Sequence, residues 1–202
     1  MPPPSRAVFA RHAASLIVHR PGADGTEVLM GERNAGSRFM PSRLVFPGGA
    51  VDPADADAPA ATEPDPVVLA HLQRHGRPRL ARAVLVAAAR ELEEETGLSL
   101  GAPPRLHVME YLCRAVTPPT MHMRFNARFL LVRADAVEGT LRSSDELERV
   151  RFIAVSEALQ ADLMDVTREV LGLLQPYLQL SGEERRARIR TPAFKQRRWR
   201  EE

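Results

Sequence analysis

The stretch Arg90-Glu91-Leu92-Glu93-Glu94-Glu95-Thr96-Gly97-Leu98 gathers carboxylates at the end of an apolar segment. Residues three and four positions apart are neighbours on a helix, so Glu91, Glu94 and Glu95 share one narrow face. Glu93 points the other way. Like charges on one face repel each other, and a hard divalent cation such as Mg²⁺ would relieve that repulsion by binding carboxylate oxygens. The alternative for such a charge run is a solvated acidic face.

The segment before these carboxylates has the period of an amphipathic helix from Leu80 onward. Its apolar positions share a face adjacent to the carboxylates, so the helix can bury one side and offer the other to solvent or metal. These positions are Leu85, Ala88, Ala89, Leu92 and Thr96. Gly97 is a suitable stop, because glycine readily adopts the left-handed conformation that ends many helices.

The composition is ordinary for a soluble globular protein, with 44% hydrophobic and 27% charged residues. A length of 202 residues is enough for one core, so we expect a single domain over residues 1–202. A net charge of +2 does not demand a polyanionic partner. Cys113 is the only cysteine and is expected to be a small buried hydrophobe, which fits a reducing compartment. We recognise neither a membrane span nor a secretory signal, and we expect a cytoplasmic protein without a membrane partner.

Short apolar runs separated by turn residues indicate strands on both sides of the carboxylate stretch. We expect strands at residues 13–18, 27–33, 44–46, 106–114, 125–132 and 150–155. A helix is expected at residues 165–180, and Ser156 is the expected N-cap of a helical segment before it. This order implies an α/β fold, in which a mixed β-sheet lies between helices.

Two segments differ from this pattern. Residues 53–78 are rich in Ala, Asp and Pro at first, which predicts a mobile loop followed by a short helix at about 67–74. Residues 183–202 form a basic tail with interleaved Phe194 and Trp199. Such a tail can contact nucleic acid, but the glutamates at both ends favour a solvated helix or an arm packed on another subunit. A homodimer is therefore open, and nucleic acid is not the expected partner.

The sequence resembles the Nudix hydrolase signature in two separated pieces, Phe46-Pro47-Gly48-Gly49 and residues 90–98. In family form the signature is a glycine, five residues, a glutamate, seven residues, and then R-E-U-x-E-E-x-G-U, where U is a bulky aliphatic residue. The second piece matches every specified position. The first departs, because the acidic position is Asp55 and the spacer from Asp55 to Arg90 is much longer than seven residues. We therefore place an insertion, at about 53–78, inside the signature.

The resemblance implies an α/β/α sandwich and a metal-dependent diphosphatase, which hydrolyses the pyrophosphate of a nucleoside diphosphate linked to another moiety. It implies Mg²⁺ or Mn²⁺ as cofactor and a small-molecule nucleotide as substrate. The implied metal ligands are Gly49, through its carbonyl, and Glu91, Glu94 and Glu95. Arg90 would orient a glutamate. The general base would be Glu94, Glu95 or Glu146, although an ordinary exposed loop acid is an equal interpretation of Glu146.

The insertion is similar to one in a Nudix subgroup that includes hydrolases of coenzyme A and acyl-CoA. One or two of Arg33, Arg38, Arg43 and Arg124 are expected to bind substrate phosphates. ADP-ribose or another nucleotide is the alternative substrate. A catalytically silent domain that senses a nucleotide is the alternative function, motivated by Asp55 and the stretched spacer.

Overall fold

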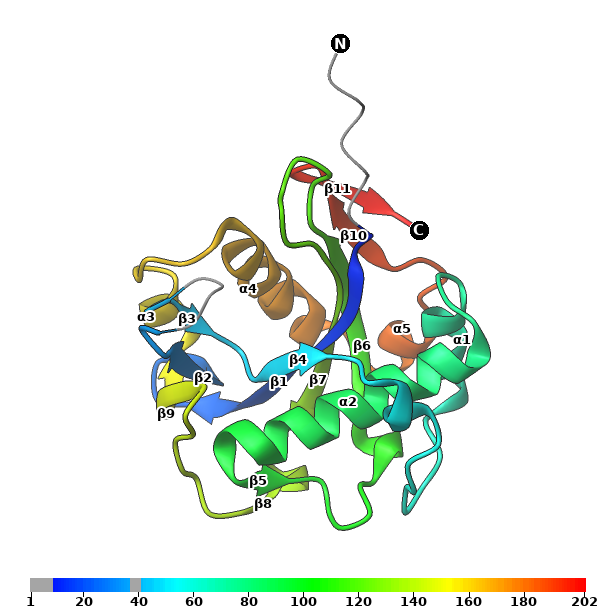
Figure 1. Cartoon of the computed structure of the whole chain (residues 1–202), viewed down its shortest axis with the longest axis horizontal. Coiled ribbons are helices and arrows are strands. Elements are labelled where there is room, and N and C mark those ends of the chain that lie inside the picture. The colour runs from blue at the N-terminus through cyan, green and yellow to red at the C-terminus, as the bar shows by residue number, and fades with distance from the viewer. Residues whose placement is uncertain (1–8, 37–40) are drawn as a thin grey trace.

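The computed structural model describes residues 9–36 and 41–202, and a nine-stranded mixed sheet runs through the centre of this part (Figure 1). Its strands are β1 (Arg11–Gly22), β2 (Gly25–Arg33), β3 (Leu44–Val45), β4 (Gly48–Ala50), β6 (Glu110–Val116), β7 (Phe125–Arg133), β9 (Leu147–Ala154), β10 (Pro192–Lys195) and β11 (Arg198–Glu201). The order is β11-β10-β6-β7-β1-β2-β3, with β4 paired to β1 and β9 to β2. The pairs β1–β7 and β6–β10 are parallel, and the other pairs of this sheet are antiparallel.

Helices cover both faces of the sheet. They are α1 (Pro66–Gln73), α2 (Pro78–Thr96), α3 (Val155–Ala158), α4 (Asp165–Gln179) and α5 (Gly182–Ala187), with 3₁₀ turns η1 (Pro53–Ala56), η2 (Leu106–Val108) and η3 (Ala134–Ala136). A small pair, β5 (Leu98–Ser99) and β8 (Glu138–Gly139), follows the end of α2. Among the described residues, no helix is long and apolar enough to cross a bilayer.

Neighbouring residues of the central strands enter two different apolar cores, because side chains alternate across a sheet. Leu16 of β1 and Leu130 of β7 pack with α1 and α2 on one face. Ile17 and Leu131, one position further, pack with α3 and α4 on the other. Cys113 is fully buried in this second core, as expected for a small hydrophobe. The fold is therefore the predicted α/β layered arrangement, with the mixed sheet between helices.

Helix α2 carries the carboxylate stretch and crosses the sheet close to β1 and β4 (Figure 1). It begins with Pro78 at its first turn and ends at Gly97, whose φ of 73° is left-handed. The predicted apolar face is buried, with Leu85 and Leu92 at 0% exposure. Truncating either leucine to alanine would cost about 2–5 kcal/mol in free energy of unfolding, since both side chains lie inside a packed core.

Four expectations differ from the structure. The strand expected from Leu106 begins later, because η2 precedes β6. Ser156 is not an N-cap, because it lies inside α3 after the N-cap residue Ala154. The helix expected at about 67–74 is present as α1, but the segment before it is not a plain loop, since it contains η1 and a bridge from Thr62 to Arg105.

The fourth difference is the basic tail at 183–202. It holds α5 and then a hairpin, β10–β11, that extends the central sheet beside β6. The hairpin turn uses Gln196 and Arg197, both at positive φ, 51° and 61°. Two left-handed residues suit the right-handed twist of a hairpin, and glycine or asparagine is the usual sequence signal for them. That signal is absent here.

Candidate active site

A cleft of about 730 Å³ opens where the C-terminal half of α2 faces β1, β4 and the beginning of α4. Its lining unites segments far apart in the sequence. The charged residues that line it are Arg11, Arg33, Arg90, Glu91, Glu94, Glu146, Asp165 and Arg197. One end is therefore rich in carboxylates and guanidinium groups, and the sequence stretch that predicts a metal site lies in its wall.

Glu95 lies behind the lining of the cleft and is only 5% exposed. Its Oε2 accepts a hydrogen bond from the Gly48 backbone N–H at 2.8 Å. Burial raises the pKa of Glu95 to about 7, and the hydrogen bond from Gly48 and the positive charge of Arg33 oppose that rise. A carboxylate held in this way by backbone is fixed in position, and its charge is only partly compensated.

Glycine is required at both Gly48 and Gly49, because neighbouring atoms lie where a Cβ would be. A Cβ at Gly48 would lie 2.4 Å from the Ala14 carbonyl oxygen, and one at Gly49 would lie 2.3 Å from Glu91 Oε1. Neither position can hold a side chain without moving its surroundings. The two glycines of β4 thus let the backbone rest directly against α2, with the Glu91 carboxylate beside Gly49. Burial raises the pKa of Glu91, and its neighbours Glu94 and Glu146 act in the same direction.

The Arg90 guanidinium donates hydrogen bonds to three carboxylates at once. Its Nε and Nη2 donate to the two carboxylate oxygens of Asp55, at 3.0 and 3.2 Å. Its Nη1 donates to Glu91 Oε1 at 2.9 Å and to Glu94 Oε2 at 3.0 Å. Asp55 is 3% exposed and also accepts from the Asp52 backbone N–H at 2.7 Å. Despite the shorter side chain and the inserted spacer, Asp55 therefore reaches Arg90 in a bidentate pair.

The remaining acids lie on the outside. Glu94 and Glu146 are exposed and line the cleft, whereas Glu93 is exposed and does not line it. Glu146 precedes β9, and its backbone carbonyl accepts from the Asn34 N–H at 3.1 Å. The negative charge of Glu146 raises the pKa of both Glu91 and Glu95, which places it in the same electrostatic field.

These groups suit a divalent cation that completes its shell with water and substrate. In the described part of the chain, no three His, Cys, Asp or Glu side chains already converge on one metal position. Arg90 lies between Glu91 and Glu94 and holds their oxygens. The donor set nevertheless fits Mg²⁺ or Mn²⁺, because both accept carboxylate and carbonyl oxygens and use few protein ligands beside phosphate.

The four arginines expected to bind phosphate have different positions. Arg33 lines the cleft. Arg43 does not line it, because it pairs with Asp162 in the segment before α4. Arg124 also lies outside the lining and donates from Nε to the Thr117 carbonyl at 3.2 Å. Arg38 lies outside the described residues. The structure thus brings only Arg33 of the described three to the cleft.

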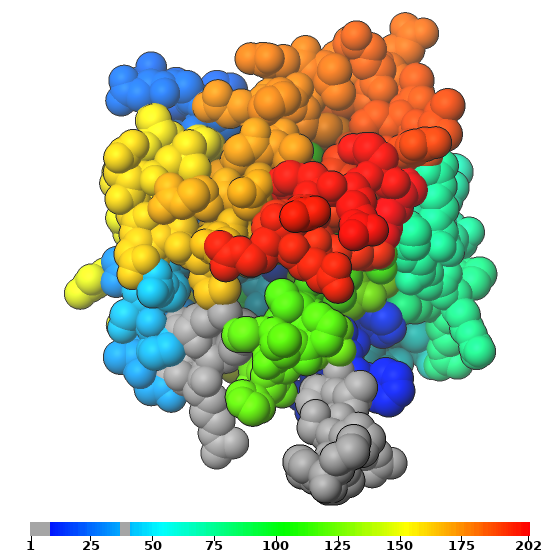
Figure 2. All heavy atoms as spheres, turned by 90° about the horizontal axis from the view of Figure 1, so that it is seen from above, coloured from blue at the N-terminus to red at the C-terminus, as the bar shows by residue number. Residues whose placement is uncertain are grey.

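The second end of the cleft is apolar, and the sequence did not predict it. The β10–β11 hairpin lies beside α4 and the β6–β7 connection (red, orange and green in Figure 2), and it supplies Phe194 and Arg197 to the lining. Trp199 donates from Nε1 to Glu169 of α4 at 2.7 Å, and Arg197 pairs with Asp165 at 2.7 Å. The apolar residues at this end include Met121, Met123, Phe125, Phe129, Val166 and Phe194.

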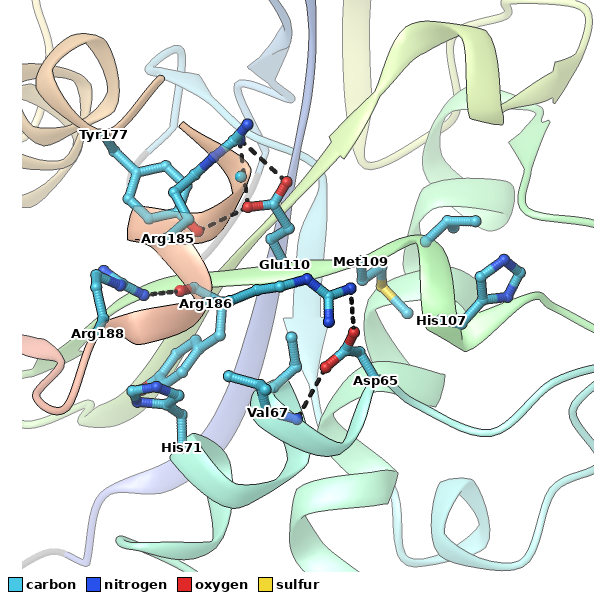
Figure 3. Close-up of a pocket in the computed structure, with 14 residues that line it drawn as sticks. Asp65, Val67, His71, His107, Met109, Glu110, Tyr177, Arg185, Arg186 and Arg188 are labelled. Carbon is cyan, nitrogen blue, oxygen red and sulfur yellow. Dashed lines mark hydrogen bonds and ion pairs between the residues drawn. The ribbon is translucent and has the colours of Figure 1, made fainter. Parts of the chain in front are cut away.

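A second, smaller pocket of about 210 Å³ lies between α1, β6 and α5. Figure 3 shows that each of its two carboxylates, Glu110 and Asp65, is paired with an arginine. Arg185 donates to Glu110 at 3.1 Å, and Tyr177 donates its hydroxyl to the same carboxylate at 2.7 Å. Arg186 pairs with Asp65 at 2.8 Å. Arg185 and Arg186 thus each have one carboxylate partner, whereas Arg188 donates to the Tyr111 and Leu112 carbonyls and lies over the Tyr177 ring.

Comparison with known proteins agrees with this geometry. Residues 75–174 match the NUDIX domain model, a region that contains α2 but neither Gly49 nor Asp55. The sequence matches none of the curated proteins compared with it. A NUDIX hydrolase from Alicyclobacillus acidocaldarius has a similar structure, with a TM-score of 0.62 and 26% identity over 83% of this chain and 92% of that one.

Two more distant structures share the fold. The E. coli ORF135 protein has a TM-score of 0.55 and 20% identity, over 85% of this chain and 93% of that one. A MutT NUDIX hydrolase from Burkholderia pseudomallei has a TM-score of 0.53 and 21% identity, over 83% and 99%. With the arrangement of Arg90 and its carboxylates, the matched domain and the 26% identical hydrolase support a place in the Nudix superfamily and a hydrolase acting on phosphoric anhydride bonds.

Proposed function

We propose that the chain is a Mg²⁺- or Mn²⁺-dependent diphosphatase, which cleaves the pyrophosphate of coenzyme A or acyl-CoA. The observation that carries the metal-dependent reaction is the carboxylate end of α2. Glu91 and Glu95 are held against Gly48-Gly49, and Glu94 faces a cleft of about 730 Å³. Repulsion among these groups makes them costly to keep together without a cation.

In this proposal Glu91, Glu94, Glu95 and the Gly49 carbonyl hold the metal, which when bound neutralises diphosphate charge and stabilises the leaving oxygen. Arg90 is a positioning residue, because its guanidinium is engaged by Asp55, Glu91 and Glu94. Arg33 is the arginine best situated for a substrate phosphate, since it lines the cleft. Glu94 and Glu146 are the exposed candidates for the base that deprotonates the attacking water.

The substrate class rests on the two unlike ends of the cleft. A diphosphate needs the charged end, while the apolar end with Met121, Met123 and Phe194 suits an uncharged extension of the substrate. Coenzyme A and its acyl esters carry such an extension, which supports them over compact nucleotides. ADP-ribose is the alternative substrate, and nucleotide sensing without turnover is the alternative function. The pairing of Asp55 with Arg90 weakens the second alternative, because the altered acidic position still supports Arg90.

A substrate panel tests the proposal. Purified chain is incubated with Mg²⁺ and either coenzyme A, an acyl-CoA or ADP-ribose, and products are separated by chromatography. We expect adenosine 3′,5′-bisphosphate from the first two, and at least about a 100-fold loss of kcat/KM in Glu94→Gln. Glu93→Gln is the matched control and retains activity, since Glu93 lies outside the cleft. Preference for ADP-ribose would overturn the substrate, and ligand binding without any turnover would overturn the reaction.

A further inference from the structure

A second concentration of like charge lies on the opposite face of the strands that line the cleft. Ala115 of β6 and Ala127 of β7 point into the cleft. Their neighbours Arg114 and Arg128, which are paired across the two strands, therefore point to the other face. Both are buried, with exposures of 7% for Arg114 and 1% for Arg128.

The partners of Arg128 are all neutral acceptors. Its Nη1 lies 2.9 Å from His12 Nδ1 and donates to the Asn126 carbonyl at 2.9 Å. Its Nη2 donates to the His75 carbonyl at 3.2 Å. A buried guanidinium with no carboxylate partner is unusual, because desolvation of its charge is then uncompensated.

The two other cations nearby, Arg114 and Lys195, share a single carboxylate partner. Glu202 pairs through Oε2 with Arg114 and through Oε1 with Lys195. Its Oε2 also lies 3.3 Å from His75 Nε2, but without the geometry of a hydrogen bond. The Nε atom of Arg114 and Nε2 of His75 are both buried and have no hydrogen-bond partner. We call Arg114, Arg128, Lys195, His12 and His75 the basic cluster.

The charges of the basic cluster do not balance. Among the described residues, Glu202 is the only carboxylate side chain paired with its three permanent cations, Arg114, Arg128 and Lys195. Residues 1–8 and 37–40 contain no Asp or Glu, so they cannot supply another carboxylate side chain. Burial lowers the pKa of all five groups, and repulsion by neighbouring cations lowers it further in Arg128, Lys195, His12 and His75.

We propose that the basic cluster is a binding site for a small phosphate-type oxyanion, either inorganic phosphate or a phosphate monoester, at the position of the Glu202 carboxylate. A phosphate group carries up to two negative charges and three or four acceptor oxygens, against one charge and two oxygens for a carboxylate. It therefore matches the surplus of cations and the unpartnered Nε–H donor of Arg114 better than Glu202 does.

The side chains that border Glu202 give access to this position. Those of Lys195 and His75 are 30% and 27% exposed, whereas Arg114 lies deeper at 8%. The backbone of Glu202 is paired with Thr191, so only its side chain has to rotate away. Glu202 then acts as an internal competitor, which the ligand displaces. The site is separate from the cleft, because none of the residues of the basic cluster lines the cleft.

Phosphate affinity of Glu202 variants tests this proposal. Inorganic phosphate is titrated into the full chain by calorimetry, at constant ionic strength and with a chelator present. We expect Glu202→Gln to bind phosphate at least tenfold more tightly than the unmodified chain. Glu201→Gln is the matched control, because Glu201 is the exposed preceding residue and loses the same charge. It should leave the affinity unchanged. Adding Arg114→Met to Glu202→Gln should remove the gain.

Equal phosphate affinity in Glu202→Gln and Glu201→Gln would overturn the proposal, and so would a gain that survives Arg114→Met. If Glu202→Gln does not fold, the unmodified chain is titrated with phosphate and followed through its backbone amide resonances. Saturable shifts at Thr191, Lys195 and Glu202 support the site. Shifts confined to the cleft would overturn it. Neither result depends on diphosphatase activity, so failure here leaves the proposed function standing.

Discussion

The carboxylate end of α2 and the basic cluster depart from balanced charge pairing in opposite directions, the first with an excess of carboxylates and the second with an excess of cations. At α2, Glu91 is half-buried and Glu95 is buried, both with raised pKa values, and Arg90 is shared among several acids. In the basic cluster, Arg114 and Arg128 are buried with lowered pKa values, and Glu202 is shared among several cations. The pocket in Figure 3 is concave too, but each of its carboxylates is paired with one arginine, and Arg188 donates to backbone carbonyls. One ion shared among several opposite charges therefore distinguishes the first two regions better than concavity does.

The largest effect on stability is expected where the only buried partner of a charge is removed. Asp55→Ala leaves Arg90 without its bidentate acceptor and should lower the free energy of unfolding by about 3–5 kcal/mol. Denaturant titration measures this. Asp57→Ala is the control, since Asp57 forms an exposed pair with Arg79 and should cost no more than about 1 kcal/mol. Equal losses would mean that Asp55 does not support Arg90.

Glu95 should destabilise the metal-free protein at alkaline pH. Its pKa is about 7 in the folded chain, against an ordinary value of 4.5. The folded state therefore binds more protons than the unfolded state between these values, and stability is lost as pH rises from 4.5 through 7. Glu95→Gln removes that loss, so it should be more stable than the unmodified chain by roughly 2–3 kcal/mol at pH 8.

The pH dependence is the control for this prediction. The advantage of Glu95→Gln should shrink steadily as pH falls toward 4.5, because Glu95 is then protonated in both states. Thermal unfolding at several pH values in a chelator measures it. An advantage that is the same at pH 5 and pH 8 would point to improved packing and not to a relieved charge.

The smallest effect is expected in the smaller pocket. Glu110→Gln weakens the pair with Arg185 but leaves the other pair, between Arg186 and Asp65, intact (Figure 3). Because the Glu110 side chain is 38% exposed, solvent screens its interaction, and the expected loss of stability is about 1 kcal/mol. Diphosphatase activity should not change. A loss as large as that of Asp55→Ala would show that charge balance does not separate these regions.

Local periodicity predicted α2 well. The apolar face from Leu85 to Thr96 is buried, Gly97 ends the helix, and Glu93 points away from the cleft. These features depend on residues close in sequence, whose spacing fixes their direction on a helix. The facing of the carboxylates follows from the same rule.

Contacts between segments that are distant in the sequence could not be predicted from local periodicity. Nothing near Arg114 indicates that Glu202 reaches it, and nothing near Asp55 indicates that the inserted residues return it to Arg90. The β10–β11 hairpin was hidden because Gln196 and Arg197 adopt left-handed conformations without a glycine. The basic tail therefore seemed exposed, although Phe194 is buried and lines the cleft.

Metal binding at the carboxylate end of α2 is the most direct test of the central claim. Calorimetric titration of Mn²⁺ into the metal-free chain should show one site in the unmodified protein and in Glu93→Gln. Glu91→Gln and Glu94→Gln should each weaken that site at least tenfold, because each removes a carboxylate facing Gly49 or the cleft. Equal affinity in all four proteins would contradict the assignment of this face as a metal site.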